Sequence, residues 1–303
     1  MSMIFDNTAL AAFNAQLIAF ETAVFEEEYD DIQYSQLIPV DTSAPEWVKG
    51  VTYASVAGVG QAKWINGGAQ DIPNADITTG ETTTEIELGA IGYSYTLEEV
   101  SQSQLHNFPL DSSRASAAHR AAEEFIDKVA LEGDASKNMS GLFNNANVNS
   151  SVAAQPFAGA TIEQTIAVIN EGLIGNPGVK RSTYAKDTVL LPTSVLQTLG
   201  TQIVPNTSQT FLHHVMENNI YTLRTGNRLT IRDVNGLDTA GAGDTTRAVF
   251  YKRDPNVVRF HMPMPHKFLP VQQVMLEFKR PGIFRIGGTE VKRTDSVSYI
   301  DTV

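Results

Sequence analysis

Six histidines have the widest chemical scope of the residues in this sequence, because imidazole serves as a general base and as a metal ligand near neutral pH. They are His106, His119, His213, His214, His261 and His266. The adjacent pair 213/214 lies on a predicted helix, where successive side chains point about 100° apart and do not readily share a metal. The pair 261/266 brackets a Met-Pro-Met-Pro connector. We interpret all six as surface or connector residues, with a metal pair at 261 and 266 as the alternative.

Paired carboxylates are the second set with catalytic potential, because two nearby acids can divide the roles of acid and base. The pairs Glu98/Glu99 and Glu123/Asp127 lie on or beside predicted helices, where acidic side chains normally face solvent. The acidic cluster at 26–31 lacks the D-x-[DN]-x-[DN]-G spacing of a calcium loop. We therefore expect neither catalysis nor calcium binding at these carboxylates.

Sequence motifs for other chemistries do not occur in the chain. The absence of cysteine excludes disulfides, thiolate zinc sites, iron–sulfur clusters and cysteine nucleophiles. The glycine-rich stretches at 58–60 and 241–243 lack the lysine of a P-loop and the GxGxxG spacing, and neither GxSxG nor HExxH is found. The sequence thus predicts no catalytic residue, no cofactor and no metal site.

Charge is divided unevenly along the 303 residues. Residues 1–150 carry 6 Lys and Arg against 22 Asp and Glu, a net charge of −16, whereas residues 151–303 carry 16 against 12, a net charge of +4. Basic doublets occur at 180–181, 252–253, 279–280 and 292–293. A non-specific nucleic-acid binder usually has a pI above about 9, and the pI of this chain is ≈ 4.9. Salt bridges between subunits are the simpler interpretation of the doublets.

Hydropathy predicts a soluble intracellular protein without membrane contact. No run approaches the ~18 apolar residues of a membrane span. The first ten residues contain Asp6 but neither Lys nor Arg, unlike the cationic start of a secretory signal. The length fits one large domain or two interleaved ones.

Before residue 98 the periodicity predicts a helix over 7–28, an extended irregular stretch over 31–50, and a long hairpin. Alternating residues from 51 and again through 82–97 form its two strands, around a glycine-rich tip of about 20 residues at 58–80. An isolated hairpin is marginal in water. We therefore expect this one to lie against its own body or against another subunit.

After residue 98 the patterns segregate into helices and strands, which is typical of the α+β class. The helix over 111–133 has an alanine-rich apolar face that includes Phe125, and it ends at Gly133. Thr161 and Gln164 form a capping box for a helix that Gly172 is expected to end. Further helices are predicted over 193–199 and 208–218, and strands over 188–191, 229–234, 248–251, 257–261, 271–278, 283–286 and 297–300.

The order of these parts resembles the major capsid protein of tailed bacteriophages, the Hong Kong-97-type fold. The shared order is an N-terminal arm, a long hairpin, a long alanine-rich helix, a mixed central domain and a final β segment. Two local sequences add to the resemblance: the glycine-led turn GDASKNMSGLFN at 133–144, and the strand–proline–helix step VLLPTSVLQTL at 189–199. The resemblance covers nearly the whole chain.

The resemblance implies an α+β, Hong Kong-97-like fold. Its implied parts are an N-terminal arm (1–50), an extended hairpin loop (51–97), a peripheral domain (98–156 and 262–303) with the spine helix 111–133, and an axial domain (157–261).

The resemblance also implies a structural, non-enzymatic subunit that self-assembles into hexamers and pentamers of an icosahedral head enclosing double-stranded DNA. Assembly is implied in the host cytoplasm, and the product is the virion capsid. The implied partners are copies of the chain, a portal, a decoration protein and packaged DNA held by non-specific contacts. Because only 50 residues precede the hairpin, the scaffold is expected to be a separate protein. Lys63 is the one lysine of the hairpin, and it is not evidence of a crosslink.

The hairpin supplies the expected contacts between subunits. Trp64 and Ile65 are large apolar residues near a polar tip, and aromatic residues are enriched in buried interfaces. With Lys63, Tyr93 and Tyr95 they form the predicted contact set, and folding of the tip onto its own body is the alternative. For the whole chain, the alternatives are an encapsulin-like compartment shell, a phage tail-tube or adhesin protein, and an enzyme with an unrecognised site.

Overall fold

The computed structural model describes residues 32–59, 62, 76–96, 98–99, 110–174 and 185–303. Residues 1–31 are a unit apart from 32–303, and the second unit contains every element described below. The helix predicted over 7–28 lies outside the described residues, as do Lys63, Trp64 and Ile65. Within the described ranges, no helix combines the length and the apolar content needed to cross a bilayer.

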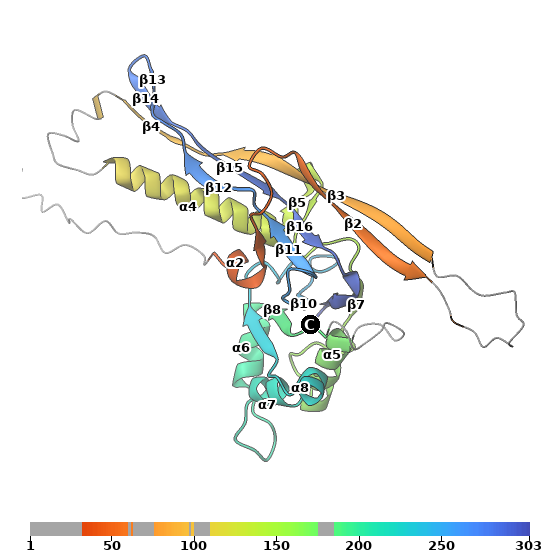
Figure 1. Cartoon of the computed structure of the whole chain (residues 1–303). Coiled ribbons are helices and arrows are strands. Elements are labelled where there is room, and N and C mark those ends of the chain that lie inside the picture. Colours follow the sequence, from red (N-terminus) through yellow and green to blue (C-terminus); the bar gives the residue numbers. More distant parts are fainter. Residues whose placement is uncertain (1–31, 60–61, 63–75, 97, 100–109, 175–184) are drawn as a thin grey trace, which may run out of the picture. The chain divides into compact units, whose positions relative to one another are not determined.

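A five-stranded mixed sheet in the order β7-β17-β10-β8-β9 organises one part of this unit. Strand β10 pairs antiparallel with both β17 and β8, while β7 and β9 add parallel strands at the edges. The strands are β7 (Ser150–Val152), β17 (Val297–Asp301), β10 (Arg247–Tyr251), β8 (Thr188–Leu191) and β9 (Thr230–Asp233). The helices grouped beside it in Figure 1 are α5 (Ile162–Ile174), α6 (Thr193–Thr201), α7 (Phe211–Glu217) and α8 (Ile220–Thr225).

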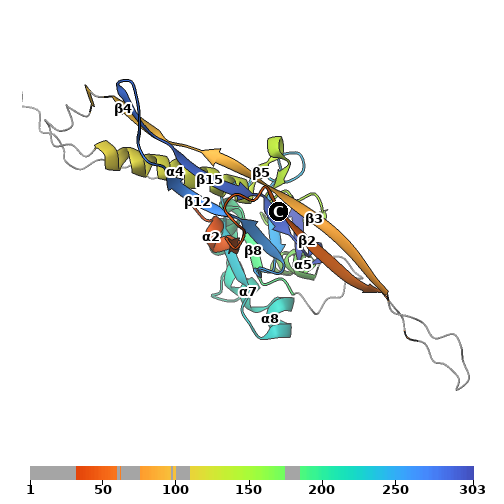
Figure 2. The same ribbon diagram turned by 45° about the horizontal axis from the view of Figure 1, so that its top comes forward.

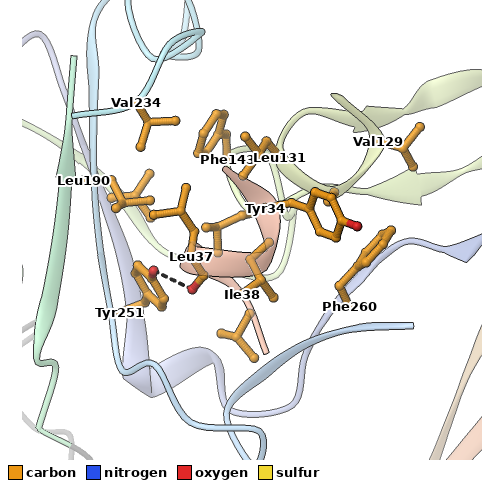
Figure 3. Close-up of a cluster of buried hydrophobic side chains, with 14 of the residues drawn as sticks. Tyr34, Leu37, Ile38, Val129, Leu131, Phe143, Leu190, Val234, Tyr251 and Phe260 are labelled. Carbon is orange, nitrogen blue, oxygen red and sulfur yellow. Dashed lines mark hydrogen bonds between the residues drawn. The ribbon is translucent and has the colours of Figure 1, made fainter. Parts of the chain in front are cut away.

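Alternate residues of this sheet enter two different hydrophobic clusters. Leu190, Val249 and Tyr251 belong to a cluster shared with α2 (Tyr34–Leu37) and α4 (Leu110–Leu131), part of which is drawn in Figure 3. Val189 and Phe250 belong to a second cluster, shared with α5, α6 and α7. Since both faces are covered, β8, β10 and β17 are buried at every position. Strands covered on both faces show continuous apolar runs, which is why the sequence located β8 and β10 closely.

A four-stranded antiparallel sheet in the order β12-β15-β3-β2 lies alongside α4, as both ribbon views show. Its strands are β12 (Met264–Phe268), β15 (Gly282–Gly287), β3 (Asp76–Ala90) and β2 (Gly50–Val59). Two three-stranded sheets continue from it, with the orders β1-β11-β16 and β13-β14-β4. The remaining elements are β1 (Val40–Asp41), β11 (Val258–His261), β16 (Thr289–Val291), β13 (Gln272–Val274), β14 (Glu277–Arg280), β4 (Tyr93–Thr96), β5 (Gly133–Asp134), β6 (Met139–Ser140), η1 (Ala135–Lys137) and η2 (Thr294–Ser296).

The segment before the hairpin is more ordered than the irregular stretch predicted over 31–50. Its short helix α2 begins under α4, because Asp127 accepts hydrogen bonds from the backbone N–H groups of Gln33 and Tyr34 at 2.9 and 2.7 Å. Leu37 and Ile38 are fully buried in the first cluster, and the carbonyl of Leu37 accepts a hydrogen bond from the Tyr251 hydroxyl at 2.8 Å (Figure 3). Long-range partners, which local periodicity does not reveal, hold this segment.

Several predicted boundaries are confirmed and others are wrong. The capping box is present, since the Gln164 side chain accepts from Thr161 N–H at 2.9 Å. Gly172 does not end α5, which continues to Ile174; a Cβ there would lie 2.5 Å from the Phe250 ring, so the glycine allows helix and sheet to approach. Phe125, placed on the apolar face of α4, is 46% exposed. The strand β12, which contains Pro265, and the short elements β16 and α8 were not predicted.

An almost fully buried ion pair joins the two central strands. Arg247 Nε and Nη2 lie 2.6 and 2.9 Å from the two carboxylate oxygens of Asp301, and Arg247 Nη1 donates to the carbonyl of Phe143. Burial acts to raise the pKa of Asp301, but hydrogen bonds from Arg247 and Ser150 hold it below its ordinary value. The pair therefore keeps its charge and joins β10 to the last strand.

Arg247→Ala should lower the free energy of unfolding by about 3–5 kcal/mol, because it leaves a buried carboxylate without its cation. Urea unfolding measures this loss. Lys279→Ala, which breaks the exposed pair with Glu277 at 3.1 Å, is the control and should cost less than about 1 kcal/mol. Equal costs for the two variants would contradict the role given to Arg247.

Lys186 makes folding sensitive to alkaline pH. Its side chain is buried and donates to Gly172 O and Ser298 Oγ at 2.8 and 2.7 Å. Desolvation lowers the pKa of Lys186 to about 8, while an unfolded lysine keeps its proton to about pH 10.4. Between these values the unfolded chain binds more protons, so stability rises with pH.

The unfolding temperature should therefore rise between pH 8 and 9.5, and calorimetry in matched buffers measures it. In Lys186→Met the rise should flatten, and Ser298 Oγ can still donate to Gly172 O at 2.8 Å. Identical pH profiles for the parent chain and the variant would rule out the lysine as the source.

Candidate assembly interface

The histidines and carboxylates considered for chemistry do not converge on one centre. Among the described residues there is no group of three or more His, Asp and Glu side chains able to hold a metal ion. His261 contacts Glu290, whereas His266 stacks on His119 with ring centroids 5.4 Å apart. His213 lies 3.6 Å from Glu217. The 261/266 pair considered for a metal thus faces two different sets of neighbours.

The hairpin β2–β3 is a two-stranded ribbon over most of its length. Ten residue pairs join it, from Gly50↔Glu85 to Val59↔Asp76. Strand β15 pairs only with residues 86–90 of β3. Among the described residues, the outer edges of the ribbon therefore have no strand partner (Figure 2). Unpaired edges are templates for other chains, and a free two-stranded ribbon is only marginally stable in water.

One face of this ribbon is acidic. Glu81, Thr83 and Glu85 are spaced by two along β3, so their side chains share a face, and all three are exposed. Neither carboxylate makes an ion pair with the part of the chain that the structure describes. Thr52 on β2 shares a hydroxyl–hydroxyl hydrogen bond of 2.9 Å with Thr83. This face presents charge and hydroxyl groups, which suits a cationic surface of another molecule.

A compact ion cluster fixes the chain that leads into the ribbon. Arg259 donates to Asp41 at 2.9 Å and to Glu290 at 2.6 Å, and His261 Nε2 lies 3.0 Å from the same Glu290 oxygen. Burial alone would raise the pKa of Glu290, but the hydrogen bonds from His261 and Arg259 hold it below its usual value. The cluster joins β1, β11 and β16, so the ribbon starts from a fixed base.

A second exposed surface lies at the turn of the hairpin β13–β14. Val274, Met275 and Leu276 are 48%, 89% and 69% exposed. Met275 has a φ of 56°, a conformation that turns usually give to Gly, Asn or Asp. Three consecutive exposed apolar residues form a patch, and such patches mark interaction sites. We call these three residues the apolar turn.

The predicted contact residues divide between described and undescribed parts of the chain. Tyr93 and Tyr95 are half-buried. Tyr95 stacks on Phe278 at 5.6 Å, and Tyr93 meets Phe268 edge-on at 5.4 Å. They do not extend the first hairpin as predicted, because β4 pairs with β14 instead. These tyrosines support the sheet that carries the apolar turn, while Lys63, Trp64 and Ile65 lie outside the described residues.

Sequence reasoning missed the apolar turn because it lies inside an apolar run, predicted as one strand over 271–278. The sequence Val-Met-Leu contains no turn-forming residue, so local chemistry gives no signal of a reversal. Two of the basic doublets, which were interpreted as salt bridges between subunits, contain a lysine that pairs within the chain. Lys252 pairs with Asp254 at 3.4 Å and Lys279 with Glu277 at 3.1 Å, both within the chain.

Comparisons with known proteins identify the family and the fold. The family of major capsid proteins matches over residues 60–303. The capsid of Myoviridae phage XM1 has a similar structure, with a TM-score of 0.81 and 18% identity over 95% of this chain and 98% of that one. Mycobacterium phage Ogopogo (TM-score 0.62, 11% identity, 96% and 98% covered) and the capsid of an empty GTA particle (0.63, 10%, 98% and 99%) are also similar in fold. No curated protein sequence matches.

The apolar turn should be needed for association between copies. Met275→Asp with Leu276→Asp should leave the unfolding temperature nearly unchanged, because both side chains are exposed, and should reduce self-association at least tenfold. Light scattering and sedimentation velocity measure the association. Met275→Leu is the matched control and should associate normally. Unchanged association of the double variant would exclude this turn from the interface.

Proposed function

The chain belongs to the major capsid protein family, and we propose that it builds the icosahedral head of a tailed phage as hexamers and pentamers of itself. Its general role is that of a structural protein of the virion capsid. Membership of this family implies a non-enzymatic protein. The encapsulin-like alternative is not favoured, since the similar structures named above belong to phage and GTA particles.

The proposed architecture is the Hong Kong-97-type fold. In this assignment β2–β3 is the extended loop, α4 is the spine helix, and the four-stranded sheet with α4 is the peripheral domain. The five-stranded sheet with α5 to α8 is the axial domain, expected over 157–261. Strands β7 and β17 pair within that sheet, so we assign both of them to the axial domain as well. Of the expected arm, residues 1–50, the described part from residue 32 onward is a packed segment.

One observation carries the proposal: the ribbon of β2 and β3 has ten cross-strand pairs and, among the described residues, no third strand beside them. A two-stranded ribbon this exposed is only marginally stable in a monomer. In an assembly, a neighbouring subunit can cover it and stabilise it. The ion cluster around Arg259 fixes the base of the ribbon, and the apolar turn at the other hairpin adds a second contact surface. Cyclic contacts among copies then close rings.

The partners beyond the chain itself are part of the same proposal. We propose a separate scaffolding protein, a portal, a decoration protein and enclosed double-stranded DNA, with assembly in the host cytoplasm. No covalent chemistry is needed for this function, because many weak contacts of modest area add up across a closed shell.

Removing residues 58–80 tests the role of the ribbon. The variant should fold, since the buried clusters lie outside this range, but should form no closed shells of normal size when examined by electron microscopy beside the parent chain. Far-UV circular dichroism and the unfolding temperature control for folding. Shells of normal size and stability from the deletion would overturn the role of the ribbon, and a parent chain that never forms rings or shells would overturn the proposed function.

A further inference from the structure

A cavity of about 360 Å³ opens where the segment before the hairpin meets the edge of the five-stranded sheet. Its floor is a row of residues across three strands, because Thr230 on β9 pairs with Thr188 on β8, which pairs with Tyr251 on β10. Gln36 and Leu37 close one side. The cavity therefore lies on described, well-packed elements rather than between loose loops.

Three arginines line this cavity and come from two segments of the chain. Arg228 precedes β9, Arg232 lies within β9 two residues after Thr230, and Arg253 follows β10. Since residues two apart on a strand share a face, Arg232 extends from the same side as the threonine row. All three side chains belong to exposed residues, so their charges are accessible. We call this group the arginine pocket.

Within the described ranges, these three arginines lack the carboxylate partners that Arg247 and Arg259 have. Arg247 and Arg259 are paired with carboxylates at 2.6 to 2.9 Å. Among the described residues, the side chain of Arg232 donates to the Gln36 amide oxygen at 3.0 Å, and that of Arg253 donates to the carbonyl of Ser35 at 3.3 Å. None of the three in the pocket forms an ion pair with a residue in the described ranges.

Asp187 is the one carboxylate among the described residues that line the pocket. It already accepts hydrogen bonds from the backbone N–H of Arg253 at 3.0 Å and from the Thr188 hydroxyl at 2.8 Å. The charges at the pocket therefore sum to about +2, on a chain whose formal net charge is −12. Such a local reversal of sign favours an anionic ligand.

We propose that the arginine pocket binds the phosphodiester backbone of the nucleic acid that the shell encloses; this rests on the proposed function. Arginine presents a planar fork of donors that matches phosphate oxygens. Thr230, Tyr221 and Asn227 also line the pocket, and hydroxyl and amide side chains together with arginine are the groups that contact DNA phosphates. Arg228 and Arg232 lie at β9 and Arg253 follows β10, so the cations are spread over two segments, which suits successive phosphates of a strand.

The surrounding charge explains why contact would be confined to this pocket. With 34 acidic against 22 basic residues, the net charge of the whole chain opposes binding of DNA. A small basic site holds the backbone without sequence preference and with strong dependence on salt. An acidic segment of another copy is the competing occupant, and the experiment below separates the two.

The test is the binding of a fluorescein-labelled 20-base-pair duplex to the purified chain, followed by anisotropy between 50 and 200 mM NaCl. The pocket variant is Arg228→Gln/Arg232→Gln/Arg253→Gln. The control variant, Lys137→Gln/Lys267→Gln/Lys279→Gln, loses the same charge at exposed lysines that pair with Glu87, Glu46 and Glu277. Unfolding temperatures verify that both variants fold.

Affinity of the pocket variant should fall at least tenfold at 50 mM NaCl, and the slope of log K against log salt should become shallower by about 2 to 3, since each lost phosphate contact removes about 0.9. The control should stay within about threefold of the parent chain. Equal loss in both variants, or no loss in the pocket variant, would overturn the inference. Electron microscopy of each sample reports assembly separately. Shells that fail only in the pocket variant, with DNA binding unchanged, would point to an acidic segment instead and overturn it too.

Discussion

The burial of β10 on both faces is the constraint on which the rest of the structure depends. All five of its residues are buried, and the four that follow Arg247 alternate between the two hydrophobic clusters. Its first residue, Arg247, is paired with the last strand through Asp301, and its last, Tyr251, binds the carbonyl of Leu37. One short strand thus joins the chain end, the helices α5 to α8 and the segment before the hairpin. Any change that exposes it disturbs both clusters at once.

From this interior the protein extends two ribbons whose surfaces are not covered by the described chain. The β2–β3 ribbon presents backbone edges and carboxylates, while the β13–β14 hairpin presents apolar side chains at its turn. By contrast, two arginines inside the described unit, Arg247 and Arg259, are paired with carboxylates. A shell subunit requires both parts: an interior that is stable within one chain, and exposed ribbons that remain free to contact other subunits.

Local chemistry predicted those parts of the fold whose stability is local or whose burial is complete. The capping box of Thr161 and Gln164 and the buried run of β8 were recognised because neighbouring residues carry the signal. The helix α2 was missed because Asp127, almost a hundred residues away, supplies its N-terminal hydrogen bonds. The turn at Met275 was missed for the same kind of reason. The chain reverses there at apolar residues, supported by the pairing of β14 with β4, and the sequence contains no turn-forming residue that would indicate it.

The predicted contact residues stay a prediction, but the structure gives two of them different neighbours from those expected. Tyr93 and Tyr95 were chosen as aromatic residues of the hairpin, yet their rings pack on Phe278 and Phe268 because β4 belongs to another sheet. The arginine pocket was outside the reach of sequence reasoning altogether. Arg253 joins Arg228 and Arg232 only through the pairing of β9 with β8 and of β8 with β10. The doublet Lys252–Arg253 does not indicate by itself that its two members have different neighbours.

The threonine-rich composition of β3 has a mechanical consequence. Strands are held in one register when an apolar face must be buried, but the described ribbon shows exposed or half-exposed side chains on both faces, with Thr82, Thr83 and Thr84 in sequence. Among the ribbon side chains that the structure describes, none at 77–85 is buried in a core that would resist a change in twist or bend. The ribbon can therefore bend and twist to fit a neighbouring subunit, while the body that carries it keeps one conformation. In this way one sequence can occupy positions of different local symmetry.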